Sequence, residues 1–431
     1  MSSEPRDEIA PQDWAVTQRS FPPAGPPFLQ ESFVVQACAD AYLPGDVRDA
    51  AVDVARHVND DPALVAFAWH AHCTLFTPGL YDRDAIRRWP VLGTALGEPA
   101  GLYYLLVLLS GVPRLRELYR QHDIPPAVAR DTLHDLERWL RHHRSEHGAW
   151  GLAPRALTWL RNHMQGQLFQ LGRLQHQLNE FQCDARVYRH RADGTVVALS
   201  DNGIRYRADG QYDGAGGVFD AEGAWTATLS VDSAAVAGFP VSPRGYVVQR
   251  EAHLPLAAWK EVLAPGDPVL QLHIPDGSPM DYAACGDSFR QALDFFPRHF
   301  PAHRFRAFAC SSWLLDAQLQ VLLPPSSNLV KFQREMYVLP APGDGRSTLS
   351  TVFDGVPEDL GRASQETTLQ RALAAHLIGG GHARSGRCFL LRDDLRWGSQ
   401  VYLRQVYLQA ESRILSEAAT APFGGVTPPP E

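Results

Sequence analysis

The sequence "VLQLHIPDGSPMDYAACGDSFRQALDFF", residues 269–296, places a strand, a loop and a helix next to one another. The apolar run ends at His273, and Pro275 stops it because proline has no N–H to give to a strand ladder. Gly277 and Gly286 bound the expected loop, and "DSFRQALDFF" then shows helical spacing. In open α/β sheets, ligands bind beyond the carboxyl ends of strands, and helix N-termini attract anions. The stretch therefore predicts a strand–loop–helix unit with a possible binding crevice at the loop.

Two interpretations of this loop are open from the residues alone. In the first, the glycines let a pyrophosphate or an acyl thioester approach the backbone, Asp287 or Ser288 caps the helix, and His273 faces the ligand. In the second, the loop is an ordinary strand-to-helix connection. The loop taken by itself favours the second interpretation, because glycine is common in turns.

Strands and helices alternate on the carboxyl side of this stretch. "RFRAFACSSW" predicts a strand, and "SSNLVKFQREMYV" predicts a helix with Ser326 or Ser327 as its N-cap. This alternation indicates a parallel or mixed sheet with crossover helices. On the amino-terminal side, Asp193-Gly194 lies between two alternating runs and predicts a hairpin. Residues 167–182 fit a helix or a strand, and periodicity does not decide between them.

The N-terminal part of the chain has a different character. Residues 31–150 carry apolar side chains three and four positions apart, with breaks at proline, which predicts an all-helical domain. Residues 1–30, which contain "FPPAGPPF", are expected to form an extended lead-in. Residues 165–418 are expected to form a mixed-sheet α/β domain with a last helix around 399–417, and 419–431 a frayed tail. The predicted class is therefore α+β / α/β, with an all-α domain followed by a mixed-sheet domain.

Composition narrows the classes of partner. A net charge of −8 and a pI near 6.1 in 431 residues argue against a sequence-independent nucleic-acid binder, which needs a basic face. The longest apolar run, "LYYLLVLL" at 102–109, is too short to span a membrane and predicts a core helix. The polar N-terminus does not resemble a signal peptide, and the six cysteines form no C-x-x-C pair. We expect a cytoplasmic protein that binds neither nucleic acid nor membranes.

Two further patterns suggest catalysis or metal binding. Cys310 and Ser311 end the strand after the opening stretch, where a nucleophile with His273 as its base is chemically conceivable. No G-x-S-x-G elbow surrounds them, so buried small residues at a strand end are the more common explanation. His143 and His147 lie four apart, as zinc ligands on a helix can, but the H-E-x-x-H order is absent. No metal is expected.

The sequence "QYDGAG", residues 211–216, matches the Q-x-x-G-x-G pattern with which many acetyl-coenzyme A enzymes hold pyrophosphate. That mechanism needs a helix to begin at the motif, so that backbone N–H groups converge on the anion. The sequence that follows is broken by glycine and then alternates. We therefore predict a glycine-rich hairpin loop here and no phosphate site.

Four segments resemble a bacterial family of acyltransferases: "GDPVLQLHIPDGSPM", "SFRQALDFFPRHFP", "FACSSWLLDAQLQVLLPPSSNLVKFQ" and "TTLQRALAAHLIGGG". Members of that family pair a helical N-terminal domain with a C-terminal domain of GNAT-like fold. The similarity is strongest over residues 165–395. It implies direct transfer of an acyl group from acyl-coenzyme A to an acceptor such as an amine.

The resemblance also implies roles for residues at the cofactor side. "VLQLHI" would be the central strand that splays from its neighbour, and the next helix, beginning near Gly286, would hold the pyrophosphate. Gly277, Asp287 and Ser288 would lie beside it as cofactor-binding residues.

On the chemical side, the resemblance implies that His273 deprotonates the acceptor and that Tyr337 protonates the departing thiolate. Ser311 and Asn328 would lie on the acceptor side. The usual Q/R-x-x-G-x-G/A motif is absent from the expected position. The alternative is therefore a non-catalytic module that binds a metabolite or a protein in a degenerate GNAT-like crevice. The acceptor, the acyl length and the oligomeric state stay open.

Overall fold

The computed structural model describes residues 11–276 and 278–403. The chain divides into two compact units. The first unit runs from the N-terminus to Gln177 and also takes in Arg298–Phe300. The second unit contains the rest of the chain from Leu178 onward.

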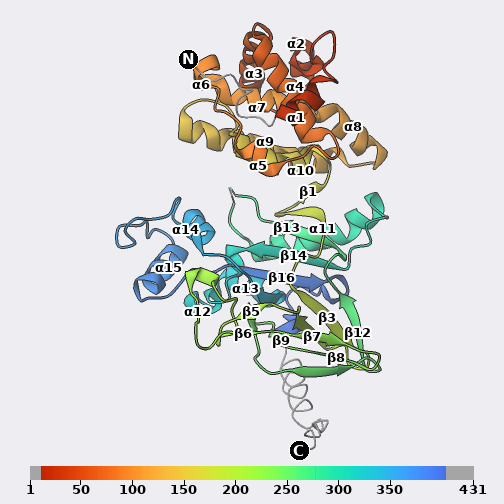
Figure 1. Cartoon of the computed structure of the whole chain (residues 1–431), viewed down its shortest axis with the longest axis vertical. Helices are drawn as coiled ribbons and strands as arrows, with labels where there is room; N and C mark the ends of the chain where they lie inside the picture. The colour runs from red at the N-terminus through yellow and green to blue at the C-terminus, as the bar shows by residue number, and fades with distance from the viewer. Residues whose placement is uncertain (1–10, 277, 404–431) are drawn as a thin grey trace, which may run out of the picture. The chain divides into compact units, whose positions relative to one another are not determined.

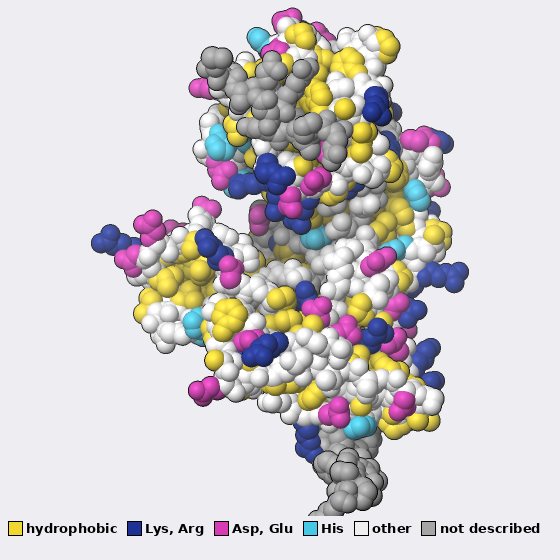
Figure 2. All heavy atoms as spheres, viewed as in Figure 1, with side chains coloured by type: hydrophobic (Ala, Val, Ile, Leu, Met, Phe, Trp, Pro, Cys, Tyr) yellow, Lys and Arg dark blue, Asp and Glu magenta, His cyan; other side chains and the backbone are white. Residues whose placement is uncertain are grey.

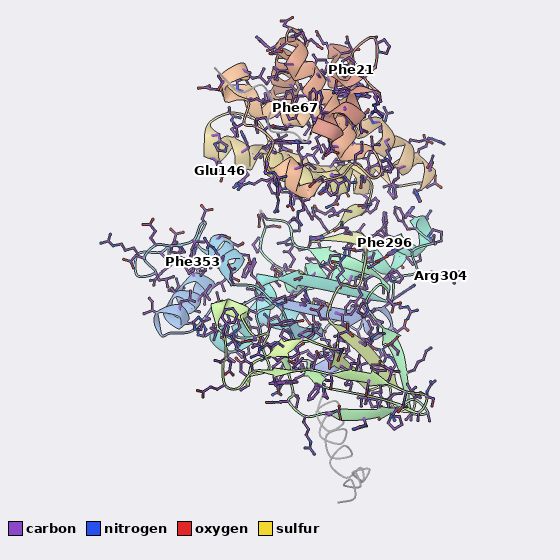
Figure 3. All side chains as sticks on the ribbon, in the orientation of Figure 1. Phe21, Phe67, Glu146, Phe296, Arg304 and Phe353 are labelled. Carbon is purple, nitrogen blue, oxygen red and sulfur yellow. The ribbon has the colours of Figure 1, made fainter. Side chains whose placement is uncertain are left out.

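The first unit is helical, as predicted (Figure 1, red to yellow). Its core helix α7 is buried along its whole length and packs against α2, α3, α4 and α10. From α4, Phe67 points into this core and stacks on Tyr103 with ring centroids 5.7 Å apart (Figure 3). The bounds of the helices are α1 Pro11–Gln18, α2 Glu31–Asp40, α3 Gly45–Asn59, α4 Pro62–Phe76, α5 Arg83–Arg87, α6 Gly93–Leu96, α7 Leu102–Leu109, α8 Val112–Gln121, α9 Pro126–His147 and α10 Pro154–Met164.

The expected extended lead-in is partly wrong, because α1 lies within it. Proline at its first position suits a helix start, where no N–H is needed. The helix packs against α4, and the Thr17 hydroxyl lies 2.9 Å from Nδ1 of the buried His70. The prediction had relied on the prolines of "FPPAGPPF", which follow this helix and leave it uninterrupted.

The ambiguous segment 167–182 forms a β-hairpin of β1 (Leu168–Leu171) and β2 (Leu174–Glu180). Leu171 pairs with Leu174 across a two-residue turn, and Gly172 supplies the positive φ of 64° that such turns require. β1 packs on α9, where the N–H of Gln170 donates to the Thr132 hydroxyl at 2.9 Å. Tertiary packing therefore decided what periodicity left open.

The amino-terminal half of the second unit is antiparallel. A five-stranded sheet has the order β10-β9-β4-β3-β12, and a three-stranded sheet has the order β11-β8-β7. The predicted hairpin at Asp193-Gly194 is confirmed, since it joins β3 to β4. The strand bounds are β3 Ala185–His190, β4 Val196–Ser200, β5 Arg205–Tyr206, β6 Trp225–Thr226, β7 Leu229–Val231, β8 Ala235–Gly238, β9 Pro240–Ser242, β10 Tyr246–Val247, β11 Ala252–Pro255 and β12 Trp259–Leu263.

The carboxyl-terminal half contains the predicted mixed sheet. Strands β13, β14, β16 and β15 lie side by side in that order. β13 and β14 are parallel and are joined through α11, whereas β16 is antiparallel to both of its neighbours. The bounds are β13 Pro268–His273, α11 Tyr282–His299, β14 Ala307–Ser312, α12 Leu319–Leu322, α13 Asn328–Glu335, β15 Tyr337–Pro340, α14 Arg346–Val352, α15 Thr368–Ile378 and β16 Gly386–Leu391. The predicted fold class is confirmed.

The carboxyl-terminal part of the second unit contains two further helices. α14 occupies residues 346–352 and lies with α15 beside the sheet (Figure 1). The predicted last helix at 399–417 is described only to residue 403, where a short 3-10 turn covers Val401–Leu403. The rest of that helix and the predicted tail lie outside the described residues. Among the described residues, no helix combines the length and apolarity needed to cross a membrane. On the face shown in Figure 2, acidic and basic side chains are interspersed.

Candidate active site

The parallel pair β13 and β14 separates at its carboxyl end. The last pair between the two strands is Gln271↔Ala309, although β13 continues to His273 and β14 continues to Ser312. β14 stays paired with β16 as far as Ser312↔Gly386. The two strands therefore stop pairing with each other before either of them ends. The carboxyl ends of parallel strands are the usual ligand sites of α/β sheets.

His273 is the last residue of β13, beyond the final pair with β14, and its side chain is half-buried. The sequence placed it correctly at the strand end. Histidine is the most common general base in enzymes, so His273 stays a candidate at the end of the parallel pair.

The helix after this strand begins earlier than the sequence suggested. α11 starts at Tyr282, and the Asp281 carboxylate accepts a hydrogen bond from the N–H of Ala284 at 2.8 Å. The carbonyl of Asp281 accepts from the N–H of Cys285 at 3.0 Å. Asp281 is thus the N-cap, a position that aspartate favours. The expectation of a helix start near Gly286 is wrong, because this cap lies five residues before the glycine.

Gly286 consequently has a packing role. It is buried inside α11, and a Cβ atom there would come within 2.4 Å of the Trp397 indole. The indole Nε1 of Trp397 donates to the carbonyl of Tyr282 at 3.0 Å, which fixes the ring against the helix. Because Gly286 lies inside α11, its N–H forms a hydrogen bond within the helix and is not available to a phosphate.

The neighbours of Gly286 fit the predicted phosphate role no better. Asp287 is exposed and forms an ion pair with Arg290 on the same helix, and Ser288 is fully buried. Neither residue lies in the loop, which contradicts the expected arrangement. Gly277, the other predicted glycine, lies outside the described residues.

A polar cluster instead surrounds the first turn of α11. The Tyr282 hydroxyl donates to the carboxylate of Glu335 at 2.7 Å, and the N–H of Gln400 donates to the same carboxylate at 3.2 Å. Burial and the hydrogen bond to Glu335 raise the pKa of Tyr282. Nζ of Lys331 lies 6.0 Å from the centroid of the Tyr282 ring, so a cation is present near the helix start.

Sequence reasoning missed most of this cluster. Its members come from the start of α11, from α13 and from the loop after β16, so no local pattern joins them. The one available signal was Lys331, because the chain has only two lysines.

Tyr337 does not lie where a proton donor is needed. It begins β15 and is fully buried, and its hydroxyl donates to the carbonyl of Val241. The same oxygen accepts from the N–H of Ala198 at 3.1 Å, and the ring stacks on Phe389. Both bonds join β15 to strands of the five-stranded sheet. The expected role as acid for the thiolate is contradicted, because this hydroxyl belongs to the core.

The predicted acceptor-side residues are both exposed at element ends. Ser311 lies on β14 beyond the last pair with β13, and Asn328 is the first residue of α13. Ser327 is the N-cap of that helix, as predicted, but its side chain makes no capping hydrogen bond. The roles of Ser311 and Asn328 stay predictions.

The alternative of a cysteine nucleophile loses support. Cys310 is buried, and burial raises the pKa of its thiol to about 12. The reactive species in thiol catalysis is the thiolate, which would be scarce at neutral pH.

The second glycine motif is a loop, as predicted. Gln211 uses its side-chain Nε2 to donate to the carbonyl of Gly245 at 2.7 Å. The residues after it form a single 3-10 turn over Ala215–Gly217, and no α-helix begins there. Within residues 11–276 and 278–403, no group of three or more His, Cys, Asp or Glu side chains is arranged to hold a metal ion.

Comparison with known proteins agrees with this geometry. Residues 168–390, just over half of the 431, match the family described as the GNAT-like C-terminal domain. The chain belongs to this GNAT-like family. Residues 32–166 match the N-acyltransferase N-terminal domain, so both parts of the predicted family pairing are confirmed. No curated protein matches the chain significantly.

Solved structures of acyltransferases share the fold of this GNAT-like protein. One, in complex with decanoyl-CoA and teicoplanin, has a TM-score of 0.58 and 23% identity, over 90% of this chain and 99% of that chain. Another, in complex with decanoyl-CoA, has a TM-score of 0.55 and 25% identity, over 89% and 97%. A mutant in complex with octanoyl-CoA has a TM-score of 0.57 and 23% identity, over 90% and 99%.

Proposed function

We propose that the protein transfers an acyl group from acyl-coenzyme A directly to the nitrogen of an amine acceptor. The observation that carries this proposal is the separation of β13 from β14 after Gln271 and Ala309, next to the N-terminus of α11. The description of the N-terminal family as N-acyltransferases supports a nitrogen acceptor. The similar structures that contain octanoyl-CoA or decanoyl-CoA support an acyl-CoA donor.

In the proposed reaction, the acceptor nitrogen forms a bond to the thioester carbon, and the carbon–sulfur bond breaks. His273 takes the proton that the nitrogen loses, and coenzyme A leaves with the bonding electrons on sulfur. The position of His273 at the end of β13 suits the role of general base, because such a base must lie close to the attacking atom. Tyr337 has no part in the step.

The phosphates of the donor are proposed to lie at the first turn of α11. The first N–H groups of a helix have no partner within the helix and favour anions. Asp281, the N-cap of this turn, opposes an anion, so Lys331 supplies the compensating positive charge. This arrangement replaces the predicted cradle around Gly286.

The first experiment separates an enzyme from a binding module. Calorimetric titration with acetyl-, octanoyl- and decanoyl-CoA measures affinity, and release of the coenzyme A thiol in the presence of a panel of amines measures turnover. We expect saturable binding of at least one acyl-CoA and amine-dependent thiol release. Binding without turnover for every amine would favour the non-catalytic alternative.

The second experiment tests the base. We expect His273→Ala to lower kcat by about 10²- to 10⁴-fold while the acyl-CoA affinity stays within about twofold, because a general base acts on the chemical step. His253→Ala is the matched control, since His253 is exposed on β11 of the three-stranded sheet. Full turnover by His273→Ala across the pH range would remove His273 from the mechanism.

The cytoplasm is the proposed location. All six cysteines are buried and none of them is in a disulfide, which suits a reducing compartment.

A further inference from the structure

Glu335 is a buried carboxylate at an unfavourable end of a helix. It is the last residue of α13 and is only 3% exposed. The C-terminal end of a helix carries a partial negative charge, which disfavours a carboxylate. The hydrogen-bond donors that Glu335 has among the described residues are neutral, the hydroxyl of Tyr282 at 2.7 Å and the N–H of Gln400 at 3.2 Å. A costly buried charge without a basic partner calls for an explanation.

Lys331 lies one turn before Glu335 on α13 and does not pair with it. Residues four apart are neighbours on a helix, so a lysine and a glutamate at this spacing often form an ion pair. In the part of the chain that the structure describes, however, Nζ of Lys331 has no acidic partner within 4.0 Å. It lies 6.0 Å from the centroid of the Tyr282 ring. The half-buried lysine therefore keeps an uncompensated charge beside the first turn of α11.

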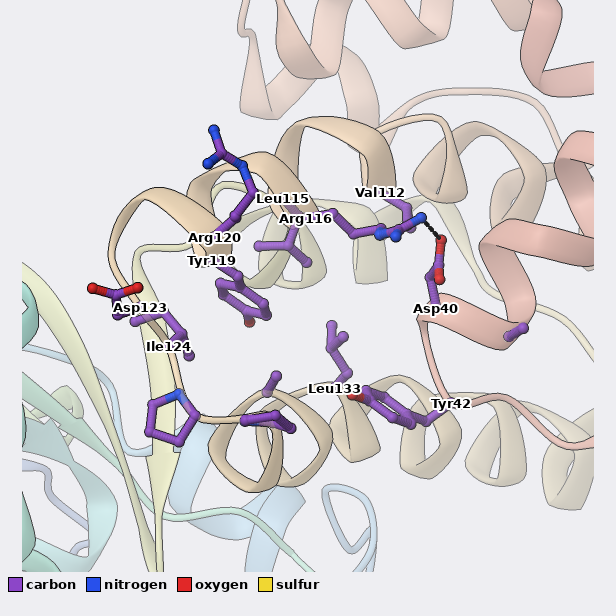
Figure 4. Close-up of a pocket in the computed structure, with 14 residues that line it drawn as sticks. Asp40, Tyr42, Val112, Leu115, Arg116, Tyr119, Arg120, Asp123, Ile124 and Leu133 are labelled. Atoms are coloured by element: carbon purple, nitrogen blue, oxygen red, sulfur yellow. Dashed lines mark hydrogen bonds and ion pairs between the residues drawn. The ribbon is translucent and has the colours of Figure 1, made fainter.

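The basic side chains at the cavity of about 590 Å³ between α8 and α9 show the opposite arrangement (Figure 4). Arg116 forms an ion pair with Asp40 at 2.8 Å, and Arg120 forms one with Glu117 at 2.6 Å. Both cations that line this largely apolar cavity are thus neutralised by the protein itself. Lys331 differs from them because a carboxylate lies one turn away and is bonded to other groups.

The hydroxyl of Tyr282 explains why the two charges stay apart. It donates to Oε1 of Glu335, and the N–H of Gln400 donates to Oε2, so each oxygen has a donor without the lysine. Burial and this hydrogen bond raise the pKa of Tyr282, which keeps its proton at neutral pH. The residue is fixed independently, because Nε1 of Trp397 donates to its carbonyl at 3.0 Å and the two rings lie 5.0 Å apart.

We propose that Tyr282 is a positioning residue of the donor site, because its hydroxyl occupies Glu335 and leaves Lys331 to a phosphate of coenzyme A. This inference rests on the proposed function, which places the phosphates at the first turn of α11. Without the hydroxyl, one oxygen of a buried carboxylate lacks its donor, and the lysine one turn away compensates it. Lys331 is then drawn from the ligand. Tyr282 thus acts through Lys331.

Calorimetric titration of the full-length protein with coenzyme A tests this role. Tyr282→Phe keeps the ring and the carbonyl that Trp397 bonds, and it removes only the hydroxyl. We expect the affinity for coenzyme A to fall about tenfold, the usual order for a lost hydrogen bond to a charged group. Lys331→Met should lose as much, and adding Tyr282→Phe to it should cause no further loss, because both changes remove one contact. Wild-type affinity in Tyr282→Phe would overturn the inference.

The double variant Tyr282→Phe/Glu335→Gln separates the charge effect from a structural one. Glutamine cannot form an ion pair with Lys331, so the affinity for coenzyme A should return to within about twofold of the wild type. If the hydroxyl only supported the fold, the second substitution would bring no recovery. A double variant as weak as Tyr282→Phe, or weaker, would therefore overturn the inference.

Tyr212→Phe is the matched control. The Tyr212 hydroxyl also donates to a carboxylate, that of Asp184, at 2.7 Å, but no lysine lies one helical turn from Asp184. This variant loses the same type of bond and should bind coenzyme A like the wild type. If the wild-type protein itself binds neither coenzyme A nor any acyl-CoA, the proposed function fails. If the wild type binds and Tyr282→Phe binds equally well, only the role of Tyr282 fails.

Discussion

Tyr119 in the helical unit and Tyr337 in the mixed-sheet unit both bury their hydroxyl oxygens, but only one of the oxygens is bonded. That of Tyr337 donates to Val241 and accepts from Ala198, whereas that of Tyr119 has no partner among the described residues. The sequence suggested a functional role for Tyr337 and none for Tyr119. The structure gives Tyr337 a role in the core, since its bonded hydroxyl stabilises the fold, whereas the Tyr119 hydroxyl makes no such bond among the described residues.

The largest expected effect comes from removing the bonded hydroxyl. Tyr337→Phe leaves the N–H of Ala198 and the carbonyl of Val241 without this partner inside the core. We expect a loss of about 2–4 kcal/mol in the free energy of unfolding, since each buried unsatisfied group costs roughly 1–3 kcal/mol. Chemical denaturation measures this loss, and Tyr119→Phe is the matched variant that should show none. A stable Tyr337→Phe protein with no thiol release would reverse the comparison and restore Tyr337 to the reacting site.

Two buried aspartates, one in each unit, have pKa values that are shifted in opposite directions. Burial raises the pKa of Asp135 in the helical unit, but His163, Trp159 and Arg138 outweigh it and bring the value to about 2. In the mixed-sheet unit, burial dominates at Asp316 and raises its pKa although the N–H of Gln318 donates to it. The folded protein therefore stabilises the ionised form of Asp135 and destabilises the ionised form of Asp316.

The second prediction concerns the free energy of unfolding at low pH. A carboxyl whose folded pKa is lowered stabilises the protein above its unfolded pKa, and the stabilisation is lost as the pH falls toward the folded value. Asp135 should therefore contribute about 2 kcal/mol above roughly pH 4 and lose it toward pH 2. Denaturation curves between pH 6 and 2.5 measure this slope, which Asp135→Asn should reduce.

Asp316→Asn is the counterpart of that variant. A raised carboxyl pKa gives stability at low pH that is lost as the pH rises, so the slope at Asp316 has the opposite sign. If Asp135→Asn leaves the pH dependence of the free energy of unfolding unchanged between pH 6 and 2.5, groups other than Asp135 dominate the loss of stability in acid.

The smallest expected effect separates packing from phosphate binding at α11. Gly286→Ala forces the new methyl against the Trp397 indole, which costs about 1–3 kcal/mol, and the gain in helix propensity returns up to about 1 kcal/mol. We expect a net loss of about 1–2 kcal/mol with acyl-CoA affinity unchanged within about twofold.

The control for this variant is Ala283→Gly, which alters an exposed position in the first turn of the same helix and costs only propensity. If Gly286→Ala instead kept its stability and lost acyl-CoA affinity, the phosphate role first expected for Gly286 would return.

Local sequence patterns predict the order of the elements. The strand that ends at His273, the hairpin at Asp193-Gly194, and the core helix at 102–109 all follow from local periodicity and turn chemistry, which act over a few residues. The sequence also contains a signal for the start of α11, because Asp281 is a favoured N-cap residue. The prediction of a start near Gly286 overlooked this signal.

Contacts between distant segments select which residues remain available for function. Tyr337 is bonded by groups 139 and 96 residues away in the chain, and Gly286 is covered by Trp397. β13 and β14 stop pairing after Gln271 and Ala309, whereas β14 stays paired with β16 to its end. Such contacts join distant segments, and neither composition nor spacing encodes which buried polar atom will lack a partner.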